Sequence, residues 1–161
     1  MTLFYDFLDS PAGTIYLLFD AKDLALAGVS FERPPGVRRG AAPEALVTQF
    51  NNYFSGRPGS QFNYHIVFLS GTEFERQIWL ALKRVPYGET RSYKWISAQV
   101  GRPGASRAAG QALSKNPLPI VLPCHRIIES GGGIGGYSPD VSIKRKLLEM
   151  EYYQAAGNFK F

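Results

Sequence analysis

Few side chains in this chain of 161 residues can bind a metal ion or form a disulfide, because it contains one cysteine and two histidines. A single cysteine cannot form an internal disulfide. The three residues together cannot provide the four ligands of a structural zinc site. We therefore expect no metal site and no cofactor, and the absence of disulfides predicts a cytoplasmic location.

Long apolar runs are also absent from the sequence. No segment approaches the roughly 18 apolar residues that indicate a membrane span, and residues 1–11 contain Asp6 and Asp9 but no basic residue. The start of the chain therefore lacks the pattern of a secretory signal, and we expect no membrane association. With 45% hydrophobic and 14% aromatic residues, the composition is that of a globular protein with a packed core.

Acidic residues are missing from residues 90–128. That stretch nevertheless contains six basic residues: Arg91, Lys94, Arg102, Arg107, Lys115 and Arg126. Residues 1–70 have a net charge of −1 and residues 71–161 a net charge of +6. A run of like charge is commonly just a solvated face. So long an absence of carboxylates around the only cysteine favours a polyanionic partner, with nucleic acid as the first candidate.

The first part of the chain predicts a small sheet and one helix. Short apolar runs at residues 3–8, 14–20 and 24–31 are separated by turn sequences, which is typical of an antiparallel meander. Residues 33–42 predict a loop, and Pro43 then opens a helical pattern that Gly56 ends. We predict a supporting first domain over residues 1–70 and a second domain over residues 71–161.

The second domain is predicted to be mostly helical. Thr72 and Glu75 fit a capping box before a helical pattern that ends at residues 86–88. Ser92 is expected to cap a helix from residue 93 to about residue 100. Pro103 is expected just inside a third helix, which ends before Asn116. This helix-turn-helix pattern predicts an α+β protein with a winged-helix-like second domain.

The last part of the chain predicts a glycine-rich turn and one more helix. Residues 130–133 form the expected turn after residues 127–128, and the chain then returns through residues 134–138. The final helix is expected over residues 140–153. Its outer side would carry Lys144, Arg145 and Lys146, and Glu151 would lie near its end.

The only cysteine, Cys124, lies in the segment N-P-L-P-I-V-L-P-C-H-R, residues 116–126. Three prolines restrict the backbone, so the segment is predicted to be rigid and non-helical. A lone cysteine beside aliphatic residues is usually a small core residue. Here His125 and Arg126 follow at once, and such neighbours lower the pKa of a thiol. This arrangement favours a reactive cysteine.

Together with residues 135–138, this segment resembles the active-site signature of the O6-alkylguanine-DNA alkyltransferases, also called methylated-DNA–protein-cysteine methyltransferases. The resemblance extends over residues 72–151. It implies that the protein flips O6-alkylguanine out of double-stranded DNA and transfers the alkyl group irreversibly to Cys124, in a single turnover. It also implies a monomer, with cooperative binding on DNA left open. By the same resemblance, His125 and Glu151 form a relay that deprotonates Cys124, with a water molecule between the thiol and the imidazole.

The resemblance assigns roles at other positions as well. Asn116 would order the active-site turn, and Tyr93 would support rotation of the phosphate and protonate the departing guanine. Arg107 would fill the base stack after flipping. The implied base pocket comprises Tyr137, Ser138, Pro119 and Ile127. The expected DNA contacts are Arg107, Ala105, Ser106, Arg102, Lys115 and Arg126.

The predicted helix over residues 105–114 is rich in alanine, serine and glycine. Few of its side chains can read base edges in a major groove, so it suits close approach to a minor groove. Small residues are equally suitable for tight packing in a core. Tyr152 and Tyr153 stand where relatives commonly have glycine after the glutamate, which leaves open whether the last helix continues.

Two other functional classes remain open from the residues alone. A non-catalytic DNA-binding module would explain the basic helix-turn-helix, but not Cys124. A cysteine hydrolase would need a histidine that is distant in sequence. Only His65 could serve, and its apolar neighbours favour a structural role.

Overall fold

The computed structural model describes residues 1–57, 61–137 and 140–157. The chain separates into two compact units, one formed by residues 1–69 and the other beginning at Ser70. Among the described residues, none of the helices combines the length and the apolar character that crossing a membrane requires. The mixed α+β architecture and the small N-terminal sheet agree with the predicted fold class.

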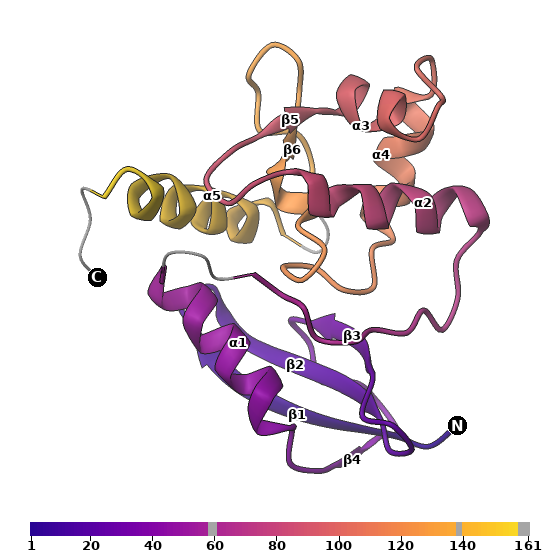
Figure 1. Cartoon of the computed structure of the whole chain (residues 1–161), viewed down its shortest axis with the longest axis vertical. Helices are drawn as coiled ribbons and strands as arrows, with labels where there is room; N and C mark the ends of the chain where they lie inside the picture. The colour runs from indigo at the N-terminus through magenta and orange to yellow at the C-terminus, as the bar shows by residue number, and fades with distance from the viewer. Residues whose placement is uncertain (58–60, 138–139, 158–161) are drawn as a thin grey trace. The chain divides into compact units, whose positions relative to one another are not determined.

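The first unit is built on the predicted meander (Figure 1). Strands β1 (Leu3–Ser10), β2 (Gly13–Asp20) and β3 (Leu26–Ser30) pair in antiparallel fashion. The sheet order is β3-β2-β1-β4, in which β4 (Arg38–Arg39) lies parallel to β1. Residues 33–42, predicted to be a loop throughout, therefore contain a short strand. Asp6 holds it at the sheet edge by accepting hydrogen bonds from Arg39 Nε at 3.2 Å and Ala42 N at 2.8 Å.

Helix α1 (Glu44–Ser55) begins after Pro43 and ends at Gly56, as predicted. Gly56 has φ 67°, a left-handed conformation that glycine adopts without steric cost. Leu46, Phe50 and Tyr53 are the buried residues of this helix. The Phe50 ring packs edge-on against Phe62, with ring centroids 4.8 Å apart. These contacts give the first unit its own apolar core.

The second unit begins with α2 (Glu73–Ala81) and the predicted capping box. Thr72 Oγ1 accepts from Glu75 N at 3.1 Å, and Glu75 Oε1 accepts from Thr72 N at 2.9 Å. The α-helix ends at Ala81, and the 3-10 turn η1 (Leu82–Arg84) carries the apolar pattern on towards Val85. The buried indole of Trp79 donates to Ala112 O at 2.7 Å, which joins α2 to α4.

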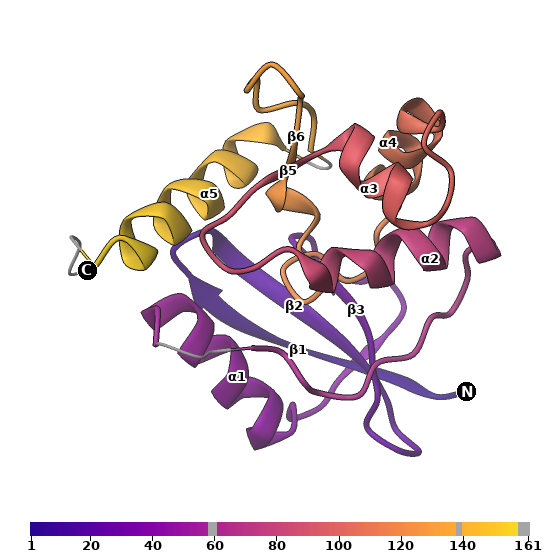
Figure 2. The same ribbon diagram turned by 45° about the horizontal axis from the view of Figure 1, so that its top comes forward.

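Helices α3 (Tyr93–Gln99) and α4 (Ser106–Ser114) form the predicted helix-turn-helix (Figure 2). Ser92 Oγ caps α3 by accepting from Trp95 N at 3.0 Å. Pro103 was expected inside α4, but it lies in the preceding turn. Ala105 N donates to Arg102 O at 2.9 Å, which closes a β-turn with Pro103 at its second position, where the fixed φ of proline is favourable.

Two short strands connect the helix-turn-helix to the cysteine segment. Strand β5 (Arg91–Ser92) directly precedes α3, and β6 (Ile127–Ile128) directly follows the 3-10 turn η2 (Cys124–Arg126). The strands pair in parallel, Arg91 with Ile127 and Ser92 with Ile128. After β6, the predicted glycine turn is closed by Glu129 N donating to Gly133 O at 2.8 Å. In the described part of the return, residues 134–137, the backbone forms no strand.

The last helix, α5 (Val141–Ala155), begins at Asp140, whose side chain accepts from Ser142 N at 2.8 Å. It continues past Glu151 through Tyr152 and Tyr153, which settles the question that these two residues raised. Arg145 and Lys146 are exposed as expected, whereas Lys144 is buried. The expectation for Lys144 was wrong because its ammonium group donates to two backbone carbonyl oxygens inside the unit.

Candidate active site

Asn116 braces the segment that presents the cysteine. Its Nδ2 donates to Leu122 O at 2.8 Å, and its Oδ1 accepts from Leu118 N at 3.0 Å. Between these contacts Ile120 has φ 75°, an uncommon conformation for a β-branched residue. Residues 118–127 are all buried. The predicted rigid segment is therefore a compact buried turn, which fixes the position of the residue that follows it.

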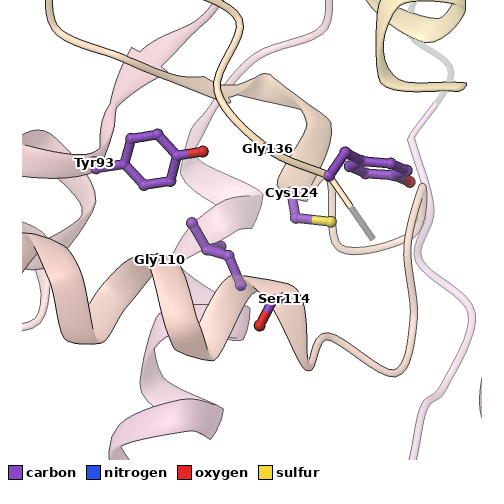
Figure 3. A pocket seen from close by; sticks show the side chains of 7 residues that line it. Tyr93, Gly110, Ser114, Cys124 and Gly136 are labelled. Carbon is purple, nitrogen blue, oxygen red and sulfur yellow. The ribbon is translucent and has the colours of Figure 1, made fainter. Parts of the chain in front are cut away.

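Cys124 lines a cavity of about 440 Å³ (Figure 3). This volume lies in the range of small-molecule sites. The lining residues come from α3, α4, η2 and the glycine-rich loop: Tyr93, Gly110, Leu113, Ser114, Cys124, Gly136 and Tyr137. In Figure 3 the Tyr93 hydroxyl group points into the space between α4 and the cysteine segment. The cavity thus brings a thiol and a phenolic hydroxyl group to one site.

Gly135 allows Tyr93 to reach the glycine-rich loop. It has φ +74°, and a Cβ atom there would lie 2.5 Å from the Tyr93 hydroxyl oxygen, closer than real Cβ contacts. Burial raises the pKa of Tyr93, and a hydrogen bond with the backbone of Gly136 opposes that rise. The hydroxyl group therefore keeps its proton at neutral pH and is available as a proton donor.

The Cys124 side chain is almost fully enclosed, with 8% of the residue exposed. Burial raises the pKa of the Cys124 thiol, while a hydrogen bond from the Asn116 side chain and the positive charge of Lys144 lower it. Burial has the larger effect. The resting group is a thiol, and since the thiolate is the nucleophile, the site needs a base.

His125 and Glu151 supply a base and its supporting carboxylate. His125 Nε2 lies 2.5 Å from Glu151 Oε2, and both side chains are buried. Burial lowers the pKa of His125, against the opposing effect of Glu151, so the imidazole is neutral. With Nε2–H donating to the carboxylate, the ring's basic lone pair is on Nδ1. This tautomer can accept a proton while Glu151 stabilises the resulting charge.

Arg126 forms hydrogen bonds with Glu151 inside the protein and is not positioned to contact DNA. The guanidinium group is buried and donates to Glu151 through Nε at 2.8 Å and Nη2 at 3.2 Å, and to Val85 O through Nη1 at 2.8 Å. Burial alone would raise the pKa of Glu151, but His125 and Arg126 outweigh it and hold that pKa well below its usual range. The prediction that Arg126 contacts DNA is corrected, because all three contacts are made inside the protein.

The other predicted DNA contacts lie around the helix-turn-helix. Arg102 and Arg107 are exposed, and Ala105 and Ser106 are partly exposed. Lys115 is also exposed, and its Nζ lies 3.5 Å from Glu75 Oε2. Glu75 lies outside the stretch that lacks acidic residues, and its carboxylate partly offsets the positive charge of Lys115. These residues belong to the turn, α4 and its C-terminal cap.

The predicted base pocket is only partly reproduced. Tyr137 lines the cavity, and burial together with the nearby Cys124 raises the pKa of its hydroxyl group. Pro119 and Ile127 are buried and are not among the described residues that line the cavity. Ser138 lies outside the described residues.

Three lining residues of α4 were not predicted as site residues: Gly110, Leu113 and Ser114. Their spacing puts them on one face of the helix. Ala109 and Ala112, by contrast, are buried in the core. The packing alternative for the small residues of this helix therefore applies to Ala109 and Ala112, whereas Gly110 and Ser114 line the cavity. Close approach of this helix to a minor groove stays a prediction.

His65, the histidine that a hydrolase would need, belongs to the first unit. Its Nε2 lies 2.8 Å from Asp23 O, and its ring stacks on Tyr64, whose hydroxyl group donates to Leu24 O at 2.7 Å. These contacts hold the turn between β2 and β3. They support the structural role.

The sequence and the structure of this chain were compared with those of known proteins, and both match one family. Residues 73–153 match the family model described as the 6-O-methylguanine DNA methyltransferase DNA-binding domain. A methylated-DNA–protein-cysteine methyltransferase of Mycobacterium leprae is 42% identical over 91% of both chains. One of Methanosarcina barkeri is 37% identical over 92% of this chain and 97% of its own.

Solved structures agree with the sequence matches. The O6-methylguanine methyltransferase of Mycobacterium tuberculosis superposes with a TM-score of 0.84 at 35% identity, covering 95% of this chain and 94% of the other. Its crystal structure in complex with DNA gives a TM-score of 0.83 at 36% identity over 93% of both chains. This chain belongs to the methylated-DNA–protein-cysteine methyltransferase family.

Proposed function

We propose that this protein repairs O6-alkylguanine in duplex DNA by transferring the alkyl group to Cys124, once per molecule. One observation carries the proposal: the only thiol of the chain lines the cavity, and the next residue is the neutral half of a buried His–Glu pair. Family membership adds support, since the relatives are methylated-DNA–protein-cysteine methyltransferases. The damaged base leaves the duplex and enters the cavity.

The proposed chemistry is a direct displacement at the alkyl carbon. His125 accepts the thiol proton through a water molecule, and Glu151 stabilises the imidazolium ion. The sulfur then forms a bond to the alkyl carbon as the bond from that carbon to O6 breaks. Tyr93 donates a proton to the departing guanine, which leaves as a neutral base, and the imidazolium proton later restores the phenol through solvent. Holding sulfur and carbon in line contributes about 7 to 11 kcal/mol.

The product explains why the reaction would stop after one turnover. A thioether is neither hydrolysed nor reduced by thiols, and the sequence contains no second cysteine to accept the group. The methyl group also stays on a cysteine of which 8% is exposed, and extra volume against its packed neighbours costs about 1 to 3 kcal/mol. The alkylated protein should thus be both inactive and less stable.

The decisive experiment is intact-mass analysis with an excess of duplex that contains O6-methylguanine. We expect one methyl group to be added, with no further increase on longer incubation, and peptide mapping to place it on Cys124. An undamaged duplex of the same sequence is the control. An unchanged mass would favour the non-catalytic binding module, and repeated turnover would indicate a different enzyme.

DNA binding is assigned to the second unit and its helix-turn-helix. Arg102 and Arg107 are exposed there, in a stretch without carboxylates, and the matched family model is a DNA-binding domain. We propose phosphate contacts that depend little on base sequence, because α4 presents small side chains. Affinity should then fall steeply as salt concentration rises. Residues 1–69 are proposed to support this unit, in a protein that acts as a monomer in the cytoplasm.

Replacing Arg107 with alanine tests base flipping. In the proposed role Arg107 occupies the space that the flipped base leaves in the stack, which offsets part of an unstacking cost of a few kcal/mol. The transfer rate from duplex should fall at least about tenfold, while reaction with free O6-benzylguanine stays near the parent rate.

The matched control is Arg145→Ala, which removes an exposed arginine from α5 instead. Rates on both substrates should be measured by intact mass under single-turnover conditions. Equal losses on duplex and free base for Arg107→Ala would contradict the flipping role.

A further inference from the structure

Lys144 is a buried charged residue for which the proposed reaction has no use. It lies on α5, two helical turns before Glu151, and exposes 1% of its surface. Its Nζ donates to Ile127 O at 2.6 Å and to Gly136 O at 3.1 Å. Burying an ammonium group is costly unless its partners compensate. Its position therefore requires an explanation in terms of what it contacts.

The two carbonyl groups belong to different segments of the chain, both next to residues of the candidate site. Ile127 follows the turn that carries Cys124, and Gly136 lines the cavity next to Tyr137. The same ammonium nitrogen lies 5.8 Å from the centre of the Tyr93 ring. One side chain from α5 thus connects the cysteine segment, the glycine-rich loop and the tyrosine that the mechanism uses as proton donor.

Lys144 also contributes a positive charge to this group of residues. The titratable groups that interact with it are Cys124 and His125 from η2, Glu129 from the loop after β6 and Tyr93 from α3. Burial lowers the pKa of Lys144 to about 8, while Cys124 and Glu129 oppose that change. At pH 7 the ammonium form still predominates, so the charge is present when the thiolate forms.

We propose that Lys144 is a positioning residue, which holds the Gly136–Tyr137 wall of the cavity against the cysteine segment and keeps a positive charge beside the sulfur. This inference rests on the proposed role of Cys124 as alkyl acceptor. Its test does not need damaged DNA. Iodoacetamide alkylates a thiolate directly: the sulfur–carbon bond forms, iodide leaves, and the thiol proton passes to the buffer.

The experiment compares Lys144→Gln, Lys144→Met and Lys146→Met with the parent protein. The rate of Cys124 alkylation by iodoacetamide is followed by mass spectrometry across the pH range. Both Lys144 variants should react roughly threefold to tenfold more slowly than the parent at pH 7, where the parent ammonium group is charged, and this difference should narrow above pH 8, where that group loses its proton. Lys146→Met removes an exposed charge from the same helix, so it should retain the parent profile.

The Lys144→Gln variant is included in case Lys144→Met does not fold. Its side-chain amide carries no charge but can still donate to the two carbonyl groups. Circular dichroism establishes that each variant is folded. A folded Lys144→Gln protein that reacts at the parent rate at pH 7 would overturn the proposal. If the parent protein fails to take a methyl group from DNA but the Lys144 variants react more slowly at pH 7 as expected, the proposed function falls, while the effect of Lys144 on the thiol remains.

Discussion

Replacing Cys124 with alanine is expected to abolish alkyl transfer completely while leaving duplex binding unchanged. The chain contains no other thiol, and the other described residues that line the cavity are two tyrosines, a leucine, a serine and two glycines. Alanine is smaller than cysteine and apolar, so the buried turn should tolerate it. Transfer is measured by intact mass, and binding by fluorescence anisotropy at one fixed salt concentration.

His65→Gln is a useful control for this experiment because it removes the histidine that a cysteine hydrolase would need. It should transfer the methyl group at the parent rate. Methyl transfer by the Cys124→Ala variant would disprove the assignment of the acceptor. Loss of both transfer and binding would mean that the substitution had disturbed the fold, which the circular dichroism spectrum would reveal.

Replacing Arg126 with methionine is expected to lower the free energy of unfolding by about 3 to 5 kcal/mol. The guanidinium group makes two hydrogen bonds to Glu151 and one to Val85 O, all inside the protein. Without it the buried Glu151 carboxylate loses both hydrogen bonds from the guanidinium group. The measurement is urea unfolding at neutral pH.

The double variant Arg126→Met/Glu151→Gln should recover part of this loss, because it buries no uncompensated charge. The exposed Lys115, which pairs with Glu75, provides a comparison: Lys115→Met should have a far smaller effect. An Arg126→Met protein as stable as the parent would contradict the buried-pair interpretation.

The pH dependence provides a second check on the Arg126–Glu151 pair. In the parent protein the pKa of Glu151 is held below its unfolded value, so its contribution to stability is present above that value and is lost as the pH falls through the folded pKa. In Arg126→Met this pKa should rise towards the unfolded value, because burial is then opposed by His125 without Arg126. The stability difference between variant and parent should therefore narrow as the pH falls.

Most elements of the fold could be predicted because local signals determine them. The Thr72 capping box, the Ser92 cap and the Gly56 terminus all appear in the structure as expected. The order Cys124–His125 and the later Glu151 could be read from the family resemblance, and the structure places His125 and Glu151 in contact. Signals of this kind depend on a few neighbouring residues or on a recognised motif.

Two of the errors concern charged residues whose positions depend on distant partners. Arg126 and Lys144 look like surface charges in the sequence, yet each is buried through contacts with residues that lie far away along the chain. The short strand β4 depends in the same way on Asp6, 33 residues away from Arg39. Neither periodicity nor composition contains information on such pairings.

The parallel pairing of β5 with β6 has a consequence for how this family can diverge. Backbone groups make that pairing, Arg91 with Ile127 and Ser92 with Ile128, and it sets the start of α3 beside the end of the cysteine turn. Substitutions at Arg91 and Ile128 therefore leave the pairing itself unchanged, whereas Ser92 also caps α3 and Ile127 is buried. An insertion or deletion between Ser92 and Tyr93, or between Cys124 and Ile127, would shift that spacing at once. The spacing between Tyr93 and Cys124 thus depends on the lengths of these two segments through the backbone pairing.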